Sequence, residues 1–385
     1  MKICMFLMTE FTHDARVTKE AKTLINAGHK VVVIALNDKD TKKIEKRDGF
    51  IIERVNVRTR YLLPKGGLFF FVKYLEFLFR ILIKLWSEPF DVYHAHDLET
   101  LPIGFILSKI NKKPVVYDSH ELYIETEHIK GIVRTIWYQI EKLLSPKVDV
   151  IIHVNKMIAS VFAKRYKVVQ PFVIMNTQHV NLKNRGNLLR EKLNISQNDK
   201  ILLYQGLISP ERGADVLLET MNHLEGIVLV YIGPGGYIKS LREKVKQHKK
   251  RDEIFVIDRV PWKTLADYTS SADLGISLIQ NTCLNNYYSV PNKLFEFLSA
   301  GLPVVFSDFP MFREIISKNR VGFVVDENDP TAAAEAIKKI INDRKVYEEM
   351  SKNAKKLISK KFNWNKEGEK LVGIYAQLLK TGRND

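Results

Sequence analysis

The sequence predicts an α/β protein of two domains, each built around a doubly wound parallel sheet. Its 385 residues exceed the roughly 250 to 300 residues at which a single hydrophobic core stops growing. Short runs rich in apolar and β-branched residues alternate with amphipathic helical stretches, which is typical of βα units. A polar stretch at residues 177–200 divides these runs into two sets. We therefore predict an N-terminal domain of residues 1–185 and a C-terminal domain of residues 186–364.

Each predicted sheet rests on six strand-like runs in chain order. The first set is KICMFLM (2–8), HKVVVIAL (29–36), DVYHAH (91–96), KPVVYDS (113–119), VDVIIHVN (148–155) and PFVIMN (171–176). The second set is KILLYQG (200–206), VLVYIGPG (228–235), EIFVID (253–258), ADLGISLI (272–279), PVVFSD (303–308) and VGFVVD (321–326). Such Val- and Ile-rich runs are typical of strands that helices cover on both faces.

Composition and cysteine content argue against a disulfide-rich secreted protein. With 45% hydrophobic and 27% charged residues, the chain resembles ordinary soluble globular proteins. Cys4 and Cys283 have no metal-binding spacing, so we expect a reduced, cytoplasmic setting without disulfides. The N-terminal run MKICMFLMTEF is too short for a signal peptide and is better explained as a buried strand.

Positive charge is concentrated in the N-terminal half. The net charge of the chain is +16, and residues 1–200 hold 33 Lys and Arg against 21 Asp and Glu. No helix-turn-helix, RRM or zinc pattern accompanies this excess, so we do not expect a nucleic-acid partner. An anionic membrane surface or a pyrophosphate-bearing acceptor would explain the asymmetry.

The most informative segment is SVPNKLFEFLSAGLPVV, at residues 289–305. Ser289 is placed to cap a helix, Pro291 fits its first turn, and the Gly-Leu-Pro sequence ends it. The start of such a helix offers unpaired N–H groups and a positive dipole end to an anion, and Lys293 adds a formal charge. A Rossmann-type helix with a surface pair of Lys293 and Glu296 is the simpler alternative.

This segment resembles the nucleotide-sugar-binding signature of family 4 retaining glycosyltransferases, which have the GT-B fold of two Rossmann-like domains facing a central cleft. The PNKLFE form is similar to a bacterial branch that acts in surface-polysaccharide pathways. The resemblance implies that Glu296 binds the donor ribose, while Pro291, Asn292, Lys293 and Leu294 belong to the loop and helix start that hold the diphosphate.

The resemblance assigns donor-binding roles to further loops of the second set. Gly206 ends the strand KILLYQG at a position of close approach to the ligand, and Gly233 lies in the loop after the next strand. Arg212 matches a basic residue that binds the donor diphosphate. The backbone around Arg259 and Val260 matches the segment near the nucleobase. Tight turns at the glycines and a solvated Arg212 are the structural alternatives.

Two positions depart from the family pattern. Leu207 stands where the family usually has a second basic residue, so one of two expected phosphate contacts is missing. Tyr288 stands eight positions before Glu296, where many members have a glutamate that contacts the donor sugar. These departures leave the mode of sugar recognition open.

Candidate acceptor-binding residues follow strands of the first set, where open α/β sheets bind ligands. Asp14 and Arg16 follow the first strand, although Asp14 could instead cap a helix. Asp97 and Glu121 follow two later strands. His120 matches a family histidine that contacts the transferred sugar, and a hydrogen-bonded structural residue is the alternative. No cluster has zinc-like spacing, so we expect neither a metal nor a cofactor.

Residues 68–86 predict a helix with one narrow polar stripe, formed by Lys73, Glu76, Arg80 and Lys84. These charges argue against a transmembrane span. The aromatic residues at the helix ends and the basic residues beside it are typical of an interfacial anchor on an anionic membrane. A core helix between the sheet and neighbouring helices is the alternative.

The resemblance implies a retaining, metal-independent hexosyltransferase, and the composition and the helix at residues 68–86 add the expectation that it is cytoplasmic and peripheral on the inner face of the cell membrane. We expect transfer from a nucleotide-sugar, a UDP-sugar rather than a GDP-sugar, to a hydroxyl of a glycan or lipid-linked acceptor in surface-polysaccharide or glycoconjugate biosynthesis. The predicted catalytic residues are Arg212, Lys293, His120 and Glu296. A nucleotide-sugar 2-epimerase on the same fold and a catalytically weakened sugar-binding subunit are the alternatives. The final helix, at about residues 365–385, resembles the segment that packs back on the N-terminal domain.

Overall fold

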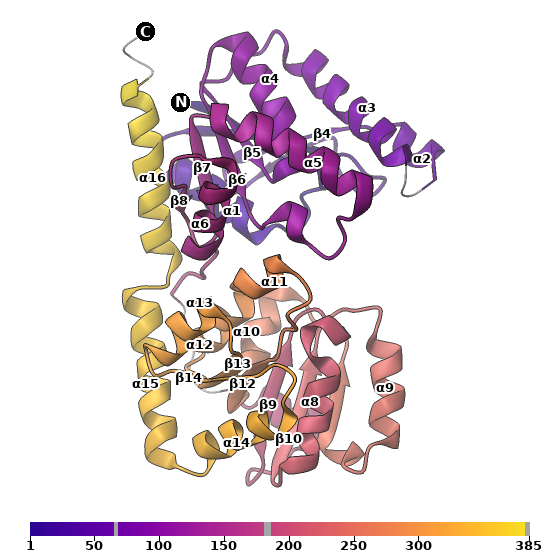
Figure 1. The fold of residues 1–385 in the computed structure, drawn as a ribbon, viewed down its shortest axis with the longest axis vertical. Coiled ribbons are helices and arrows are strands. Elements are labelled where there is room, and N and C mark those ends of the chain that lie inside the picture. The colour runs from indigo at the N-terminus through magenta and orange to yellow at the C-terminus, as the bar shows by residue number, and fades with distance from the viewer. Residues whose placement is uncertain (65–67, 181–185, 382–385) are drawn as a thin grey trace. The chain divides into compact units, whose positions relative to one another are not determined.

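The chain folds into two α/β units, shown in Figure 1. The structure is a computed structural model that describes residues 1–64, 68–180 and 186–381. Unit 1 comprises Met1–Asn176 and Glu367–Asp385, and unit 2 comprises Thr177–Lys366. The division therefore falls nine residues before the predicted boundary, which adjoins residues 181–185 outside the described ranges.

Unit 1 is built around an eight-stranded sheet with the order β3-β4-β2-β1-β5-β6-β7-β8. Neighbouring strands pair in parallel except for β3, which runs antiparallel to β4. The strands are β1 (Lys2–Phe6), β2 (Lys30–Leu36), β3 (Ile44–Arg47), β4 (Phe50–Val55), β5 (Val92–His96), β6 (Val115–Ser119), β7 (Val150–His153) and β8 (Phe172–Val173). β5 and β6 are buried along their whole length.

The helices of unit 1 pack on this sheet. They are α1 (Ala15–Asn26), α2 (Thr59–Leu62), α3 (Leu68–Leu85), α4 (Leu101–Asn111), α5 (Gly131–Leu144), α6 (Lys156–Tyr166) and most of α16 (Trp364–Thr381). α4 packs against β5 and β6 and contacts α3 on one side and α5 on the other. α16 joins unit 1 through the Glu367 carboxylate, which accepts the Met175 N–H at 2.9 Å.

Unit 2 is built around a six-stranded parallel sheet with the order β11-β10-β9-β12-β13-β14. The strands are β9 (Lys200–Gln205), β10 (Ile227–Ile232), β11 (Ile254–Ile257), β12 (Leu274–Ser277), β13 (Val304–Ser307) and β14 (Gly322–Val325). The helices are α7 (Leu188–Leu193), α8 (Ala214–Thr220), α9 (Ile238–Gln247), α10 (Trp262–Ser270), α11 (Leu284–Tyr288), α12 (Asn292–Ser299), α13 (Pro310–Phe312), α14 (Pro330–Ile341) and α15 (Arg344–Lys360).

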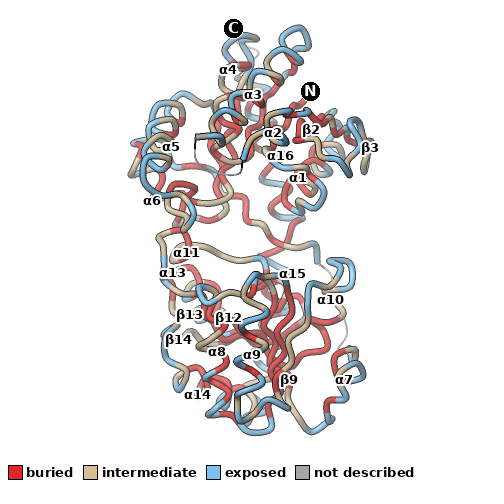
Figure 2. Tube along the Cα trace, turned by 90° about the vertical axis from the view of Figure 1, so that its right-hand side faces the viewer, coloured by how far each residue is buried: buried red, intermediate tan, exposed pale blue. Residues whose placement is uncertain are grey.

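Both sheets reverse their strand order at one point, and this point positions the candidate sites. In unit 2 the order reverses between β9 and β12, and in unit 1 between β1 and β5. Loops at the carboxyl ends of the strands diverge there and leave room for a ligand. The strands that flank these points are buried, as the red segments of the trace in Figure 2 show. None of the described helices is long and apolar enough to cross a bilayer.

Candidate functional site

Among the described residues, no side chain caps the N-terminus of α12. Pro291 is its N-cap residue and has no polar side chain that could bond the first N–H groups. The prediction that Ser289 caps this helix is wrong, because Ser289 is the C-cap residue of α11 and its hydroxyl donates to the Asn286 carbonyl at 3.0 Å. The uncapped N–H groups and the dipole make the start of α12 a favourable place for an anion.

Lys293 is buried one residue into α12, with an exposed fraction of 9%. Its Nζ has no hydrogen-bond partner among the described residues and lies 4.1 Å from the centre of the Tyr204 ring. Burial first, and then the charge of Arg212, lower the pKa of Lys293 to about 7, although Glu296 acts in the opposite direction. A buried ammonium without an anion partner is costly, so this group is suited to receive a negatively charged ligand.

Gly206 and Gly233 bring the ends of β9 and β10 close together. Both have positive φ, at +113° and +155°, where L side chains are strained. A Cβ on Gly233 would lie 1.8 Å from the Gly206 carbonyl oxygen, and a Cβ on Gly206 would lie 3.2 Å from Cε of Lys293. Because neither glycine has a side chain, the backbone at the ends of β9 and β10 lies open beside Lys293.

Glu296 lies one turn after Lys293 and is fixed by a residue that the sequence analysis did not identify. Gln205, at the end of β9, donates from Nε2 to the Glu296 carboxylate. Its Oε1 accepts a hydrogen bond from the Thr269 hydroxyl at 2.8 Å. Gln205 is 1% exposed and immediately precedes Gly206. Its position at the carboxyl end of a buried strand was the available signal.

The remaining predicted donor residues lie on loops of unit 2. Arg212 is half-buried at the end of a short 3₁₀ helix, and it is near enough to depress the pKa of Lys293. Leu207 is 51% exposed, and because its side chain is apolar it supplies no positive charge at that position. Arg259 is exposed and Val260 is half-buried in the segment before α10.

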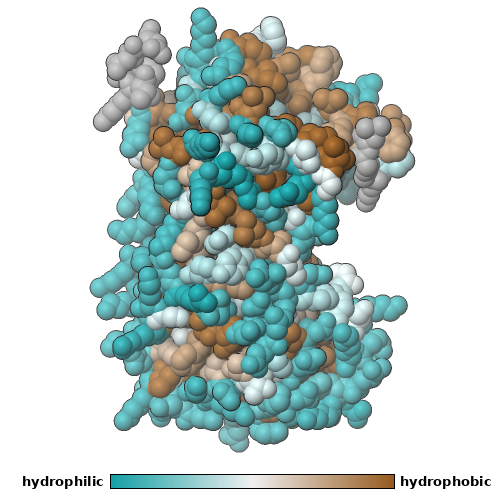
Figure 3. Space-filling model, viewed as in Figure 1, coloured by the Kyte–Doolittle hydropathy of each residue, from teal (hydrophilic) through white to brown (hydrophobic). Residues whose placement is uncertain are grey.

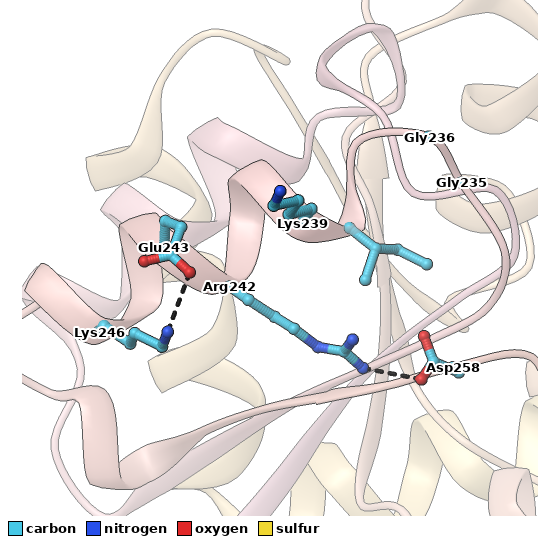
Figure 4. A pocket seen from close by; sticks show the side chains of 8 residues that line it. Gly235, Gly236, Lys239, Arg242, Glu243, Lys246 and Asp258 are labelled. Atoms are coloured by element: carbon cyan, nitrogen blue, oxygen red, sulfur yellow. Dashed lines mark hydrogen bonds and ion pairs between the residues drawn. The ribbon is translucent and has the colours of Figure 1, made fainter.

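A cavity of about 380 Å³ lies at the start of α9 and does not include Lys293 or Glu296. Figure 4 shows its lining, in which Gly235 and Gly236 face α9. Arg242 pairs with Asp258 at 2.9 Å, and Lys246 pairs with Glu243 at 2.9 Å. Because these pairs balance most of its charge, we place the anion site at Lys293 rather than in this cavity.

In unit 1, Asp118 is the centre of a buried polar network. Its Oδ2 lies 3.0 Å from Arg16 Nε, 3.2 Å from His120 Nε2 and 3.3 Å from His96 Nδ1. Arg16 also donates to Asp118 Oδ1 at 2.7 Å and to the Ile174 carbonyl at 2.7 Å. Arg16 is 3% exposed, and its guanidinium is engaged within the protein, so its role toward an acceptor stays a prediction.

His120 is held between two carboxylates at the edge of this network. Its Nδ1 lies 3.2 Å from Asp97 Oδ2, and its backbone N–H donates to Asp97 Oδ1 at 2.9 Å. Burial alone would lower the pKa of His120, but the charges of Asp97 and Asp118 outweigh it and raise the pKa well above its usual value. The two carboxylates therefore favour the protonated form of the imidazole. Asp97 has a strained φ of 62°, which is uncommon for a residue other than glycine.

The other two acceptor candidates have local structural bonds. Asp14 caps α1, since its Oδ1 accepts the Val17 N–H at 3.0 Å. This is the alternative that the sequence left open. Glu121 is half-buried, and its carbonyl accepts a hydrogen bond from the Ser119 hydroxyl at 2.8 Å.

Four buried residues of the network could offer ligand atoms to a metal: Glu20, His94, His96 and Asp118. Their ligand atoms lie within 4.8 Å of one another. Arg16 Nε, however, lies 3.0 Å from both carboxylates. A divalent cation would have to displace this guanidinium, so we assign the charge balance to Arg16. The sequence analysis did not identify Glu20 or His94, and the latter bonds the Tyr375 hydroxyl of α16 at 2.7 Å.

Two family descriptions match the chain, one for each unit. "Glycosyltransferase Family 4" matches residues 15–176, and "Glycosyl transferases group 1" matches residues 187–357. These matches and the two parallel-sheet units define the class of protein, which is a glycosyltransferase with the GT-B fold. The two matched ranges together span well over half of the chain. The chain belongs to the family 4 glycosyltransferases, as the sequence motif predicted.

Individual proteins are similar over most of their length. The uncharacterized glycosyltransferase MJ1607 of Methanocaldococcus jannaschii is 24% identical over 92% of this chain and 91% of its own. The capsular polysaccharide biosynthesis glycosyltransferase CapM of Staphylococcus aureus is 25% identical over 88% of this chain and 90% of its own. Among solved structures, Anabaena HepE in complex with UDP-glucose superposes with a TM-score of 0.77 at 16% identity, covering 98% of this chain and 100% of HepE. This likeness confirms the predicted fold class.

Proposed function

We propose that this glycosyltransferase retains the anomeric configuration of the sugar, takes it from a UDP-sugar, and needs no metal ion. The acceptor is a hydroxyl of a glycan or of a lipid-linked glycan in surface-polysaccharide or glycoconjugate biosynthesis. The similarity to CapM, named for capsular polysaccharide biosynthesis, and to HepE, solved with UDP-glucose, supports this choice.

The observation that carries the proposal is the buried Lys293 at the uncapped start of α12, whose Nζ has no hydrogen-bond partner in the part of the chain that the structure describes. When the bond from sugar to diphosphate breaks, negative charge develops on the leaving phosphate. Lys293, Arg212 and the first N–H groups of α12 would stabilise that charge, which lowers the barrier because the charge is greater in the transition state than in the bound substrate. These fixed cations do the work that a divalent ion would otherwise do.

Glu296 is suited to bind the ribose of the donor. Its carboxylate is oriented by Gln205, so it can accept hydrogen bonds from ribose hydroxyls with little further loss of side-chain conformational entropy. A carboxylate accepts such bonds more strongly than a neutral group. Glu296 would thus bind the ribose, and Lys293 with the open backbone at Gly206 and Gly233 would receive the diphosphate, so both parts of a nucleoside diphosphate have a binding partner.

His120 is proposed to orient the transferred sugar rather than to remove a proton. The two neighbouring carboxylates keep its imidazole protonated, and a protonated imidazole has no lone pair with which to act as a base. In a retaining transfer, the leaving phosphate oxygen takes the proton of the acceptor hydroxyl on the same face. No separate protein base is then required.

The test is transfer from a panel of UDP- and GDP-sugars to candidate acceptors, with the product linkage determined by NMR. We expect release of UDP that depends on the acceptor, and a product with the anomeric configuration of the donor. An inverted product would refute retention, and a preference for GDP-sugars would refute the choice of nucleotide. Conversion of the nucleotide-sugar without an acceptor would instead identify an epimerase.

A further inference from the structure

Helix α3 carries apolar side chains on two opposite faces. One face, with Tyr74, Phe77, Ile81 and Leu85, is buried against the sheet of unit 1. The opposite face exposes a row that we call the outer stripe, which consists of Phe69, Val72, Leu75, Phe79 and Ile83, with Trp86 directly after the helix. Steps of three and four residues put the members of this row on one side of a helix.

The exposure of the outer stripe is large for apolar side chains. Leu75, Phe79 and Ile83 are 62%, 62% and 61% exposed, and Trp86 is 59% exposed. Isolated exposed apolar residues are common, but contiguous apolar patches on monomers usually mark a site of interaction. A helix that served only as a core element would place polar residues on this side.

The charges of α3 are used for contacts within unit 1. Glu76 accepts the N–H groups of Arg58 at 2.9 Å and Thr59 at 2.8 Å, at the start of α2. These bonds and the one from Arg80 outweigh burial and lower the pKa of Glu76 to about 2. Lys84 pairs with Glu53 of β4 at 2.5 Å. The predicted polar stripe therefore faces α2 and β4, which leaves an apolar surface outward.

A basic surface continues from the outer stripe onto α4. Ile106 and Ile110 of α4 are each 40% exposed, and Lys109, Lys112 and Lys113 beside them are exposed. Helices α3, α4 and α5 with the two lysines after α4 hold eight Lys and Arg against two Glu, of which Glu141 is buried. In Figure 3, hydrophobic side chains gather over the region where Figure 1 draws α3 and α4.

We propose that the outer stripe and the basic end of α4 dock on the surface of an anionic lipid bilayer. Apolar side chains would enter the headgroup boundary, while lysines contact anionic headgroups, as interfacial helices do. A second copy of this chain fits less well, because two basic surfaces would then face each other. The surface is remote in sequence from Lys293 and Glu296, so the proposal does not depend on the donor chemistry.

The test is co-sedimentation of the full chain with vesicles of phosphatidylcholine alone or with added phosphatidylglycerol. We expect pelleting with the anionic vesicles at low salt and partial release at high salt, because the Debye length falls from about 10 Å at 0.1 M to about 3 Å at 1 M. Wild-type protein that stays in the supernatant at low salt overturns the proposal. Equal pelleting with both kinds of vesicle overturns the charge contribution.

Two sets of variants separate the apolar and the basic contributions. The triple variant Leu75→Gln/Phe79→Gln/Ile83→Gln should bind anionic vesicles at least about tenfold more weakly. The pair Lys109→Glu/Lys113→Glu should lose about as much, since each basic residue near such a surface contributes about 1 kcal/mol. Unchanged vesicle binding in either variant overturns the assignment of that part of the surface.

Matched controls have the same substitutions elsewhere on the exposed surface. Val169→Gln/Phe172→Gln/Leu379→Gln changes exposed apolar residues away from α3, and Lys338→Glu/Lys339→Glu reverses two exposed charges on α14. Both controls should bind vesicles as the wild type does, and all variants should keep the wild-type melting temperature and affinity for UDP. A dimer in sedimentation velocity that the triple variant alone abolishes would identify a second copy as the occupant and overturn the membrane proposal.

Discussion

Lys293 changes its protonation state near neutral pH, because burial and the charge of Arg212 lower its pKa to about 7. A bound diphosphate should raise that pKa, since a nearby anion favours the charged form. Above pH 7 the enzyme must therefore take up a proton when it binds UDP, and the affinity should fall as the pH rises. Calorimetric titration about one pH unit above 7, in two buffers with different ionisation enthalpies, measures this proton uptake. The variant Lys293→Met should lose it, and Lys239→Met should not.

The same shift predicts how stability depends on pH. The unfolded chain holds the Lys293 proton up to its ordinary pKa of 10.5, whereas the folded protein releases it at about 7. Between these values the unfolded state binds more protons, so the contribution of Lys293 to the free energy of unfolding increases with pH. A contribution that decreases over this window, relative to Lys293→Met, would contradict the burial of an unpaired amine.

Glu296 should contribute strongly to nucleotide affinity. The variant Glu296→Gln keeps the size of the side chain but removes the charge that accepts ribose hydroxyl protons. A hydrogen bond to a charged group contributes about 1.5 to 3 kcal/mol, so the affinity for UDP should fall by about ten- to a hundredfold. Calorimetry with UDP measures the loss, and Glu219→Gln on the exposed side of α8 is the control. Wild-type affinity in folded Glu296→Gln would remove this residue from the site.

At the scale of elements, the close approach of β9 and β10 predicts unequal effects of two neighbouring glycines. Gly233→Ala would put a methyl group 1.8 Å from the Gly206 carbonyl oxygen, so the strand ends must move apart. Gly236→Ala meets no atom within 4 Å. We expect Gly233→Ala to lower both the melting temperature and the affinity for UDP, while Gly236→Ala leaves both nearly unchanged. Thermal melts with and without UDP make the comparison.

Most of the strands that the sequence predicted are buried along nearly their whole length, whereas the β3–β4 hairpin was missed. Its sequence, IEKRDGFIIERV, is half charged, so it lacks the longer apolar run by which the other strands were found. The signal present was the pair Asp48-Gly49, which has positive φ at both positions, 48° and 91°. Two such residues favour a hairpin turn. The prediction that Ser289 caps α12 was wrong because a serine between two helices can lie at the end of the first helix as well as at the start of the second.

The candidate site was predictable from the sequence only in part. The helix-start motif located Lys293 and Glu296, because a local pattern carries both. Gln205, which orients Glu296, comes from a strand 91 residues away, and the buried state of Lys293 depends on Tyr204 and Gly206 of that same strand. Likewise, Arg16 was assigned to a ligand because no local pattern shows that Asp118 lies beside it. Such pairings follow from topology rather than from spacing along the chain.

At the scale of the whole molecule, the fixed cations predict that transfer continues without divalent metal. Activity should be unchanged after treatment with EDTA and exchange into metal-free buffer, because Lys293 and Arg212 supply the charge at the leaving group. Arg212→Ala should instead lower turnover by on the order of 10² to 10³, by analogy with the loss of an oxyanion donor, and Arg320→Ala at an exposed site should not. Restoration of EDTA-treated enzyme by Mg²⁺ or Mn²⁺ would contradict metal independence.

The packing of α16 has a consequence for biosynthesis. Unit 1 is formed from two segments separated by unit 2, and Leu371 and Tyr375 of its second segment, in α16, are fully buried. A ribosome makes this helix after unit 2, because Thr177–Lys366 precede it in the chain. The segment translated first therefore has an unfilled core, with His94 lacking its tyrosine partner, until α16 has been made. Unit 2 is a single continuous segment and can fold during synthesis. The first half of the polypeptide to be made is thus the last to be completed, and nascent chains stalled before Glu367 should remain sensitive to protease in that half.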